Sequence, residues 1–190
     1  MVPMSQSNSP GNFAPRCSLL SDGSAAILRP IEPADLPMVV AFHQLLSERS
    51  IRFRYFSQMP LKTRIAKSRL VHVCANSARD FALVVQRSDA AGNTAIIAIG
   101  RLSVLPTNPN TTPPSAELAI LIADAWQHQH LGTCVCQGLL DYAPVLGIKR
   151  LVAYLLPDNL DMQHLLEKFG FAFQEKPNDS TIVATKLLGA

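Results

Sequence analysis

The 190-residue chain has little charge and no long apolar run. Charged residues make up 16% of it and the net charge is only +3, so electrostatics give no case for a nucleic-acid partner, although a mild positive bias suits an anionic cofactor. The longest apolar runs, such as residues 81–85 and 95–100, are far shorter than the roughly 20 residues that span a bilayer. No apolar segment follows Met1, so we expect a cytoplasmic protein without membrane contact.

Cysteine is also scarce. The cysteines are Cys17, Cys74, Cys134 and Cys136. They have no framework spacing, so we expect reduced thiols rather than disulfides. His128 and His130 precede two of them in a His-x-His-x-x-x-Cys-x-Cys cluster that could be mistaken for a zinc site. If Leu131 starts a helix, Cys134 and Cys136 lie about 200° apart around its axis, so we predict no metal.

What the chain does have is apolar content and regular patterning. Hydrophobic residues make up 48%, and the length suits one domain with a full core. Residues 1–24 are rich in Ser, Pro, Gly and Asn without periodicity, which predicts a flexible tail before a single domain at 25–190. The patterns predict strands at 25–28, 80–86, 95–105, 116–123, 150–156, 171–174 and 181–186, and helices at 33–46, 61–74, 158–169 and from 131.

The most informative stretch is residues 115–147. An almost uninterrupted apolar run at 116–123 predicts a buried strand, and it holds one carboxylate, Glu117. A short polar turn at 127–132 follows and leads into the helix that begins at Leu131. A strand, a glycine-containing turn and a helix start together aim backbone N–H groups at one point, which suits a phosphate or pyrophosphate.

At these residues the chain resembles the GCN5-related N-acetyltransferases (GNAT). Gln127, Leu131 and Gly132 fit that family's pyrophosphate turn, but His130 stands where its first glycine belongs. Similar stretches follow in order at 147–151, 157–159 and 168–171. The resemblance implies an α/β (α+β) fold, a mixed central sheet of six to seven strands flanked by about four helices. It implies an acyl-CoA-dependent N-acetyltransferase that moves an acetyl group from acetyl-CoA to a primary amine, on a protein lysine or a small molecule.

The resemblance also implies a set of site residues. The cofactor-binding residues would be Ile120, Leu121, Ile122, Gln127, His128, Gln129, His130, Leu131, Gly132, Thr133 and Asn159. Glu117 would be the general base, directly or through water, because a carboxylate among apolar residues has its charged form disfavoured and its pKa raised. Alternatively, Glu117 faces water or pairs with an arginine such as Arg101.

Three positions leave alternatives open. His130 either adds a donor to the phosphates or crowds them, although histidine tolerates a left-handed backbone better than most residues. Asn159 either bonds the pantetheine arm, as the resemblance implies, or caps a helix. Leu166 stands where many relatives carry a tyrosine that protonates the thiolate, so a general acid is either dispensable or replaced by water.

The segment 46–56 indicates a subfamily. It resembles the Ser-x-x-Ser-x-Arg-Phe stretch of acetyltransferase domains that modify protein lysines and are often fused to an acyl-CoA synthetase-like region. The alternative is a helix-to-loop junction with aromatic anchors. A rival function is a non-catalytic acyl-CoA-binding regulatory module, consistent with His130 and Leu166. A homodimer is a candidate assembly.

Overall fold

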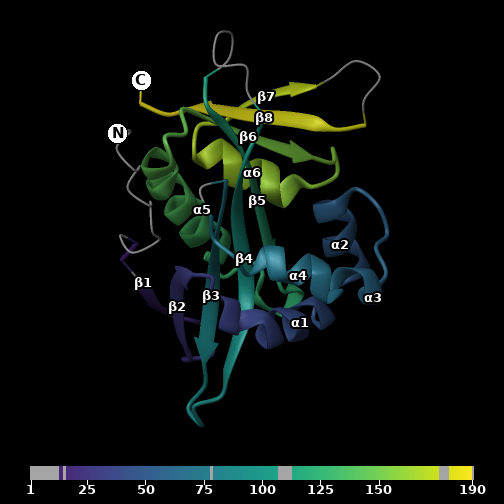
Figure 1. Ribbon diagram of the computed structural model, residues 1–190, viewed down its shortest axis with the longest axis vertical. Helices are drawn as coiled ribbons and strands as arrows, with labels where there is room; N and C mark the ends of the chain where they lie inside the picture. Colours follow the sequence, from purple (N-terminus) through teal and green to yellow (C-terminus); the bar gives the residue numbers. More distant parts are fainter. Residues whose placement is uncertain (1–12, 15, 78, 107–112, 176–179, 190) are drawn as a thin grey trace, which may run out of the picture.

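The computed structural model describes Phe13, Ala14 and residues 16–77, 79–106, 113–175 and 180–189. Eight strands form one sheet in the order β1-β2-β3-β4-β5-β6-β8-β7 (Figure 1). The strands are β1 (Arg16–Leu19), β2 (Ala25–Pro30), β3 (Asp80–Ser88), β4 (Thr94–Val104), β5 (Ser115–Ile122), β6 (Arg150–Leu155), β7 (Ala172–Glu175) and β8 (Ile182–Leu187). The α-helices are α1 (Leu36–Gln44), α2 (Glu48–Tyr55), α3 (Leu61–Arg64), α4 (Lys67–Val73), α5 (Leu131–Tyr142) and α6 (Leu160–Lys168).

The sheet opens between its fifth and sixth strands, β5 and β6. β5 and β6 are its parallel pair, and they are paired only at Ser115–Glu117, opposite Arg150–Val152. Beyond Glu117, β5 remains paired with β4 as far as Ile122, and β6 remains paired with β8 as far as Leu155. The C-terminal halves of β5 and β6 therefore diverge and leave a gap in the middle of the sheet.

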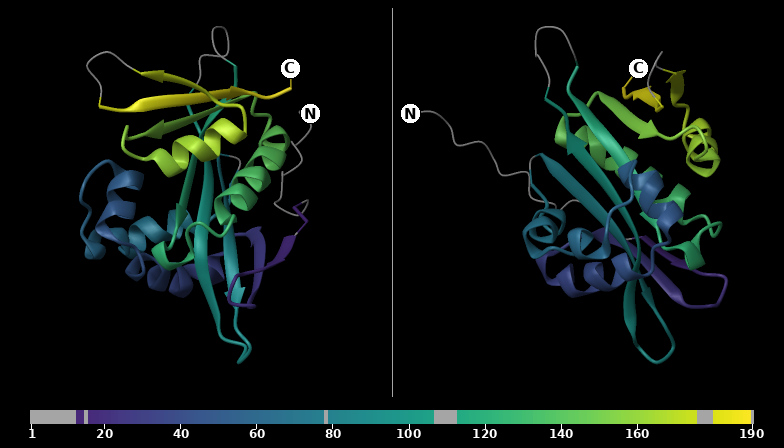
Figure 2. Two further views of the ribbon diagram at one scale, coloured as in Figure 1. Left: turned by 180° about the vertical axis from the view of Figure 1, so that it is seen from behind. Right: turned by 90° about the vertical axis from the view of Figure 1, so that its right-hand side faces the viewer.

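Helices cover both faces of the sheet (Figure 2, right). α5 packs on one face over a core that includes Leu28, Leu83 and Leu118, and α6 adds Leu166 to the same core. α1 and α4 pack on the other face over a second core that includes Val39, Phe42 and Leu70. Because successive residues of a strand point to opposite faces, β5 contributes Leu118 and Ile120 to the first core and Leu121 to the second.

The mixed α/β fold expected from the sequence is confirmed, with one more strand than expected. β1 pairs antiparallel with β2, with Cys17 opposite Ile27. A flexible tail was expected over residues 1–24, yet residues 16–19 form a strand, because main-chain pairing needs no apolar pattern. Residues 1–12 and 15 lie outside the described part of the chain, so a tail there stays a prediction.

The helical layer differs from the expected one in two places. The helix expected at 61–74 is divided into α3 and α4, and Arg64, the last residue of α3, turns inward and donates to the carbonyls of Met59 and His43. The second difference is α2, for whose residues the sequence allowed a helix-to-loop junction as an alternative. Ser47 caps this helix, since its side chain accepts a hydrogen bond from the Ser50 N–H. Within the described ranges, no helix is long and apolar enough to cross a membrane.

Candidate functional site

A cleft of about 450 Å³ occupies the gap between β5 and β6. Its walls come from α2, the second half of β5, the turn after β5, the start of α5, the end of β6 and α6. The lining residues that carry the argument below are Arg49, Ser50, Phe53, Arg54, Glu117, Leu118, Ile120, Ile122, Asp124, Gln127, His130, Gly132, Thr133, Asn159 and His164. The cleft thus reaches from the helical layer of α2, through the open sheet, to α5 and α6 on the opposite face.

The main chain of β5 presents hydrogen-bonding groups to this cleft. Ala123 N donates to Ile97 O on β4, whereas Ile122 O accepts from the Gln127 side chain instead. N–H and C=O groups of alternate residues point to the same edge of a strand, so those of Leu118 and Ile120 point away from β4, as Ile122 O does. The pairing with β6 ends at Glu117, opposite Val152, and takes up the Leu118 N–H, so the Leu118 C=O and both polar groups of Ile120 face the gap.

The turn after β5 is held in shape by two glutamine side chains and two left-handed histidines. Gln127 Nε2 donates to Ile122 O at 3.2 Å and to Ser50 Oγ at 3.1 Å. Gln129 Oε1 accepts from Ser21 Oγ at 2.8 Å, which ties the turn to the loop before β2. His128 and His130 adopt φ of 59° and 61°, so histidine does accept the left-handed conformation here.

The N-terminus of α5 is open to the cleft. No side chain caps it, and the amides of Leu131, Gly132 and Thr133 have no acceptor among the described residues, the Cys134 N–H being the first to bond back, to His130 O. Such a helix end concentrates partial positive charge. A Cβ at Gly132 would lie 3.2 Å from Leu165 Cδ2, so this glycine permits close packing rather than a positive φ.

Glu117 lies in the cleft but is less buried than the sequence indicated. Its side chain is 31% exposed, because it points toward the α2 layer rather than into the α5 core. Arg54 Nη1 of α2 lies 4.0 Å from Glu117 Oε1. Arg101, the partner considered from sequence, pairs with Asp80 at 3.1 Å instead. The carboxylate is therefore open to solvent and lies beside one guanidinium.

The start of α6 forms the opposite wall. Asn159 caps α6, since its side chain accepts from Met162 N at 3.4 Å, and it also lines the cleft. Both alternatives considered for Asn159 are therefore compatible with its position. Leu166 is fully buried in the α5 core and does not line the cleft. The side chains that α6 offers to the cleft include Met162, His164 and Lys168.

Most of the residues expected to bind the cofactor line this one cleft. These are Ile120, Leu121, Ile122, Gln127, His128, His130, Gly132, Thr133 and Asn159. Gln129 and Leu131 do not line it, because Gln129 bonds to the neighbouring loop and Leu131 packs in the core. In the part of the chain that the structure describes, no three His, Cys, Asp or Glu side chains are grouped to hold a metal ion.

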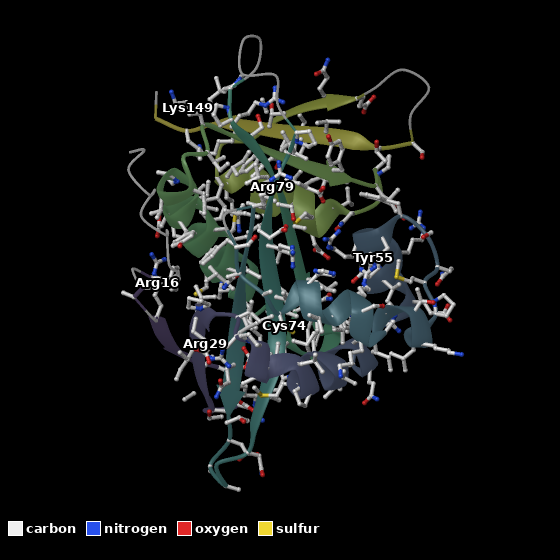
Figure 3. The ribbon with its side chains drawn as sticks, viewed as in Figure 1. Arg16, Arg29, Tyr55, Cys74, Arg79 and Lys149 are labelled. Carbon is white, nitrogen blue, oxygen red and sulfur yellow. The ribbon has the colours of Figure 1, made fainter. Side chains whose placement is uncertain are left out.

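The acceptor-side wall was not found from the sequence. α2 supplies Arg49, Ser50, Phe53 and Arg54, which share one helix face because they are three or four residues apart. The sequence contained this spacing, but the helix is short and buries only Ser50 and Ile51, so no apolar pattern indicated it. Figure 3 shows Tyr55 at the end of this helix, where the guanidinium groups of Arg54 and Arg69 lie over its ring at 5.4 and 4.9 Å.

Comparison with known proteins gives the same family as the sequence motifs. The model of the acetyltransferase (GNAT) domain matches residues 26–172. The GNAT domain of PAT from S. lividans has a TM-score of 0.77 at 24% identity, covering 95% of this chain and 99% of that one. RimJ from Mycobacterium smegmatis, solved with CoA-disulfide, has a TM-score of 0.67 at 14% identity, covering 94% and 89%. Ribosomal-protein-S5-alanine acetyltransferase from Vibrio fischeri has a TM-score of 0.65 at 16% identity, and the match covers 85% of this chain and 92% of that one.

Proposed function

The chain belongs to the GNAT acetyltransferase family, and from that premise we propose that it transfers an acetyl group from acetyl-CoA to a primary amine by direct attack. The acceptor is a lysine of a protein or a small amine. The observation that carries the proposal is the juxtaposition, in one cleft, of an uncapped helix start, unpaired strand amides and a carboxylate.

The cofactor fits the cleft in one direction. Its pyrophosphate meets the amides of Leu131, Gly132 and Thr133 at the start of α5, where the helix dipole favours negative charge. The pantetheine arm then runs through the gap between β5 and β6, past Asn159, and replaces the missing strand pairing. The thioester therefore arrives near Leu118, one residue from Glu117.

Glu117 and the β5 main chain then act on the two reactants. An amine is almost wholly protonated at neutral pH, so it must lose a proton before it attacks. Glu117 takes that proton, directly or through a water, and the amine nitrogen adds to the thioester carbonyl carbon. The N–H of Ile120, beyond the paired part of β5, stabilises the negative oxygen that forms. Collapse breaks the carbon–sulfur bond and releases CoA as a thiolate, which is a good leaving group and takes up the second proton that the nitrogen loses as the amide forms.

Substitution of Glu117 by glutamine tests the base assignment. Glutamine keeps the shape and can still bond to Arg54, but it cannot accept the proton of the amine. We expect turnover at pH 7 to fall by ~10²–10⁴-fold, with the dissociation constant of acetyl-CoA unchanged. The loss should shrink as the pH rises, because more amine is already neutral. Wild-type turnover in Glu117→Gln at pH 7 would show that the base is water or another group.

One observation favours a second function, a non-catalytic acyl-CoA-binding module. Leu166 is fully buried, so α6 places no hydroxyl near the position of the leaving thiolate. In place of a hydroxyl, α6 presents one imidazole to the cleft, that of His164. Saturable acetyl-CoA binding with no turnover over a broad panel of amines and proteins would favour this function over transfer.

A further inference from the structure

The carboxylate of Asp124, which follows β5 directly, holds the start of α2. Asp124 Oδ2 accepts from Ser47 N at 2.9 Å, and Oδ1 accepts from Ser50 Oγ at 3.0 Å and also from Ser47 Oγ. Burial would raise the pKa of the Asp124 carboxyl, but the hydrogen bonds from Ser47 and Ser50 outweigh it, so the pKa lies below its usual range. Asp124 is therefore an anion that accepts from two serines more than 70 residues away.

Ser50 connects this carboxylate to the cofactor turn. Its hydroxyl donates to Asp124 and accepts from Gln127 Nε2 at 3.1 Å, and only 7% of the residue is exposed. Gln127 also bonds Ile122 O, the last main-chain carbonyl of β5. One serine of α2 is thus bonded both to the end of β5 and to the turn that leads into α5.

The hydrogen bonds of the buried Ser50 are the main polar attachment of α2, since Ser47 and Asp124 are themselves exposed, and the apolar anchoring of the helix is small. Of its eight residues, only Ser50 and Ile51 are buried. Arg52 of α2 also forms an ion pair with Asp158. The two side chains are 44% and 56% exposed, and exposed ion pairs contribute little to stability. Tyr55 adds contacts with Arg69 at the far end.

The position of α2 determines what faces Glu117. Ser50 and Arg54 are four residues apart, one turn along the same face, so a shift at Ser50 moves Arg54 with it. Arg54 lies beside Glu117, and Phe53 lines the cleft next to it. We propose that Asp124 and Ser50 are positioning residues that fix the acceptor-side helix α2 to the cofactor turn, so that Arg54 and Phe53 stand correctly opposite Glu117 for the amine. This inference rests on the proposed transferase function.

Asp124→Asn tests the link with minimal change of shape. An asparagine has one acceptor oxygen instead of two and carries no charge, so the serine bonds weaken. We expect kcat/KM for the amine to fall about 10-fold to 100-fold, because misplacement of about 1 Å costs that much, with an acetyl-CoA dissociation constant within about three-fold of wild type. Ser50→Ala should give a similar loss, Ser50→Thr should recover part of it, and the double variant should lose less than the sum of both in free energy.

Asp89→Asn is the matched control. Asp89 also accepts from neighbouring backbone and side-chain groups, Ala91 N and both nitrogens of Asn93, but it lies in the β3–β4 hairpin loop, outside the residues that line the cleft. This variant should keep wild-type kinetics. If it loses as much kcat/KM as Asp124→Asn, or if Asp124→Asn weakens acetyl-CoA and the amine equally, the positioning role is wrong.

Hydrogen exchange separates this inference from the proposed function, since it needs no turnover. In Asp124→Asn, amides of residues 48–56 should exchange about ten-fold faster, while those of 134–142 keep their wild-type rates. Faster exchange at 48–56 in a protein that has no transferase activity would support the connection between Asp124 and α2 and refute the proposed reaction. Unchanged exchange at 48–56 in an active enzyme would overturn the link and leave the reaction standing.

Discussion

α5 and α2 border the same cleft but are attached to the protein in opposite ways. α5 buries Leu131, Val135, Cys136, Gly138, Leu139 and Tyr142. α2 buries only Ser50 and Ile51, and its contacts with the turn are hydrogen bonds. The wall that we assign to the cofactor is thus built on a close-packed core, and the wall that we assign to the acceptor is attached by polar groups. Hydrogen bonds suit a wall that has to match a particular amine, because they are directional and their residues can be substituted without disturbing the core.

The largest expected effect is on the cofactor side, at the start of α5. Gly132→Glu adds bulk against Leu165 and a negative charge beside the phosphates. We expect acetyl-CoA affinity to fall at least ~100-fold, or about 2.7 kcal/mol, in calorimetric titration. Gly132→Gln is the control, because it adds nearly the same bulk without the charge. Equal losses in both variants would assign the effect to Leu165 and remove the evidence for a pyrophosphate.

The packing of α5 gives the next effect, on stability alone. Gly100 of β4 lies beneath α5, and a Cβ there would overlap Val135 Cγ1 and lie 3.0 Å from Leu139 Cδ1. Gly100→Ala should lower the free energy of unfolding by about 2 kcal/mol in urea denaturation. A Cβ at Gly23 would meet no atom within 4 Å, so the only strain in Gly23→Ala comes from the φ of 78°. This substitution should lower the free energy of unfolding by about 1 kcal/mol. Equal costs at both sites would contradict a close-packed α5 interface.

The helical layer on the acceptor face should be sensitive to pH through His43 of α1. Burial, with Arg64 and Arg69 nearby, lowers the pKa of His43 to about 4, and its Nδ1 has no partner among the described residues. Between pH 6.5 and about 4 the unfolded chain binds the extra proton, so the free energy of unfolding falls as the pH falls. We expect about 1–2 kcal/mol to be lost between pH 7 and pH 5.

His43→Leu removes the titration and should flatten the stability profile over this interval. The carboxyls of Asp35 and Asp124, whose pKa values are lowered, lose their contributions only below this interval. An equally steep profile in His43→Leu would place the titrating group elsewhere.

His130→Gly should have the smallest effect. His130 is exposed at the open end of α5 with a φ of 61°, so glycine relieves backbone strain while removing an imidazole donor from the phosphates. We expect stability to rise by up to ~1 kcal/mol and acetyl-CoA affinity to fall about two-fold to five-fold. Tighter binding would mean that the histidine crowds the phosphates.

The strand, turn and helix around the start of α5 could be predicted from the sequence because their signals are local. The apolar run of β5, the turn and the periodicity of α5 all lie within 33 consecutive residues, 115–147. The order of the elements also followed from local patterns except for β1, α2 and the division between α3 and α4, and the family comparison confirms the superfamily. The left-handed backbone at His130 was anticipated as tolerable for histidine, and the structure shows it.

The acceptor side could not be predicted because its contacts are long-range. Ser47 and Ser50 meet Asp124 across more than 70 residues, and nothing near either serine in the chain indicates that pairing. At the break between α3 and α4, Arg64 donates to the carbonyl of His43, 21 residues earlier. The exposure of Glu117 depends on which face of β5 meets α2, which the apolar run alone did not reveal.

The central claim is that acetyl-CoA occupies the gap between β5 and β6. A crystal structure of the protein with acetyl-CoA tests it most directly. We predict the pyrophosphate at the amides of Leu131–Thr133, the pantetheine arm between the diverging strands, and the thioester carbonyl within hydrogen-bond distance of the Ile120 N–H. A cofactor bound elsewhere on the surface, with the gap between β5 and β6 left empty at saturating concentration, would contradict the account.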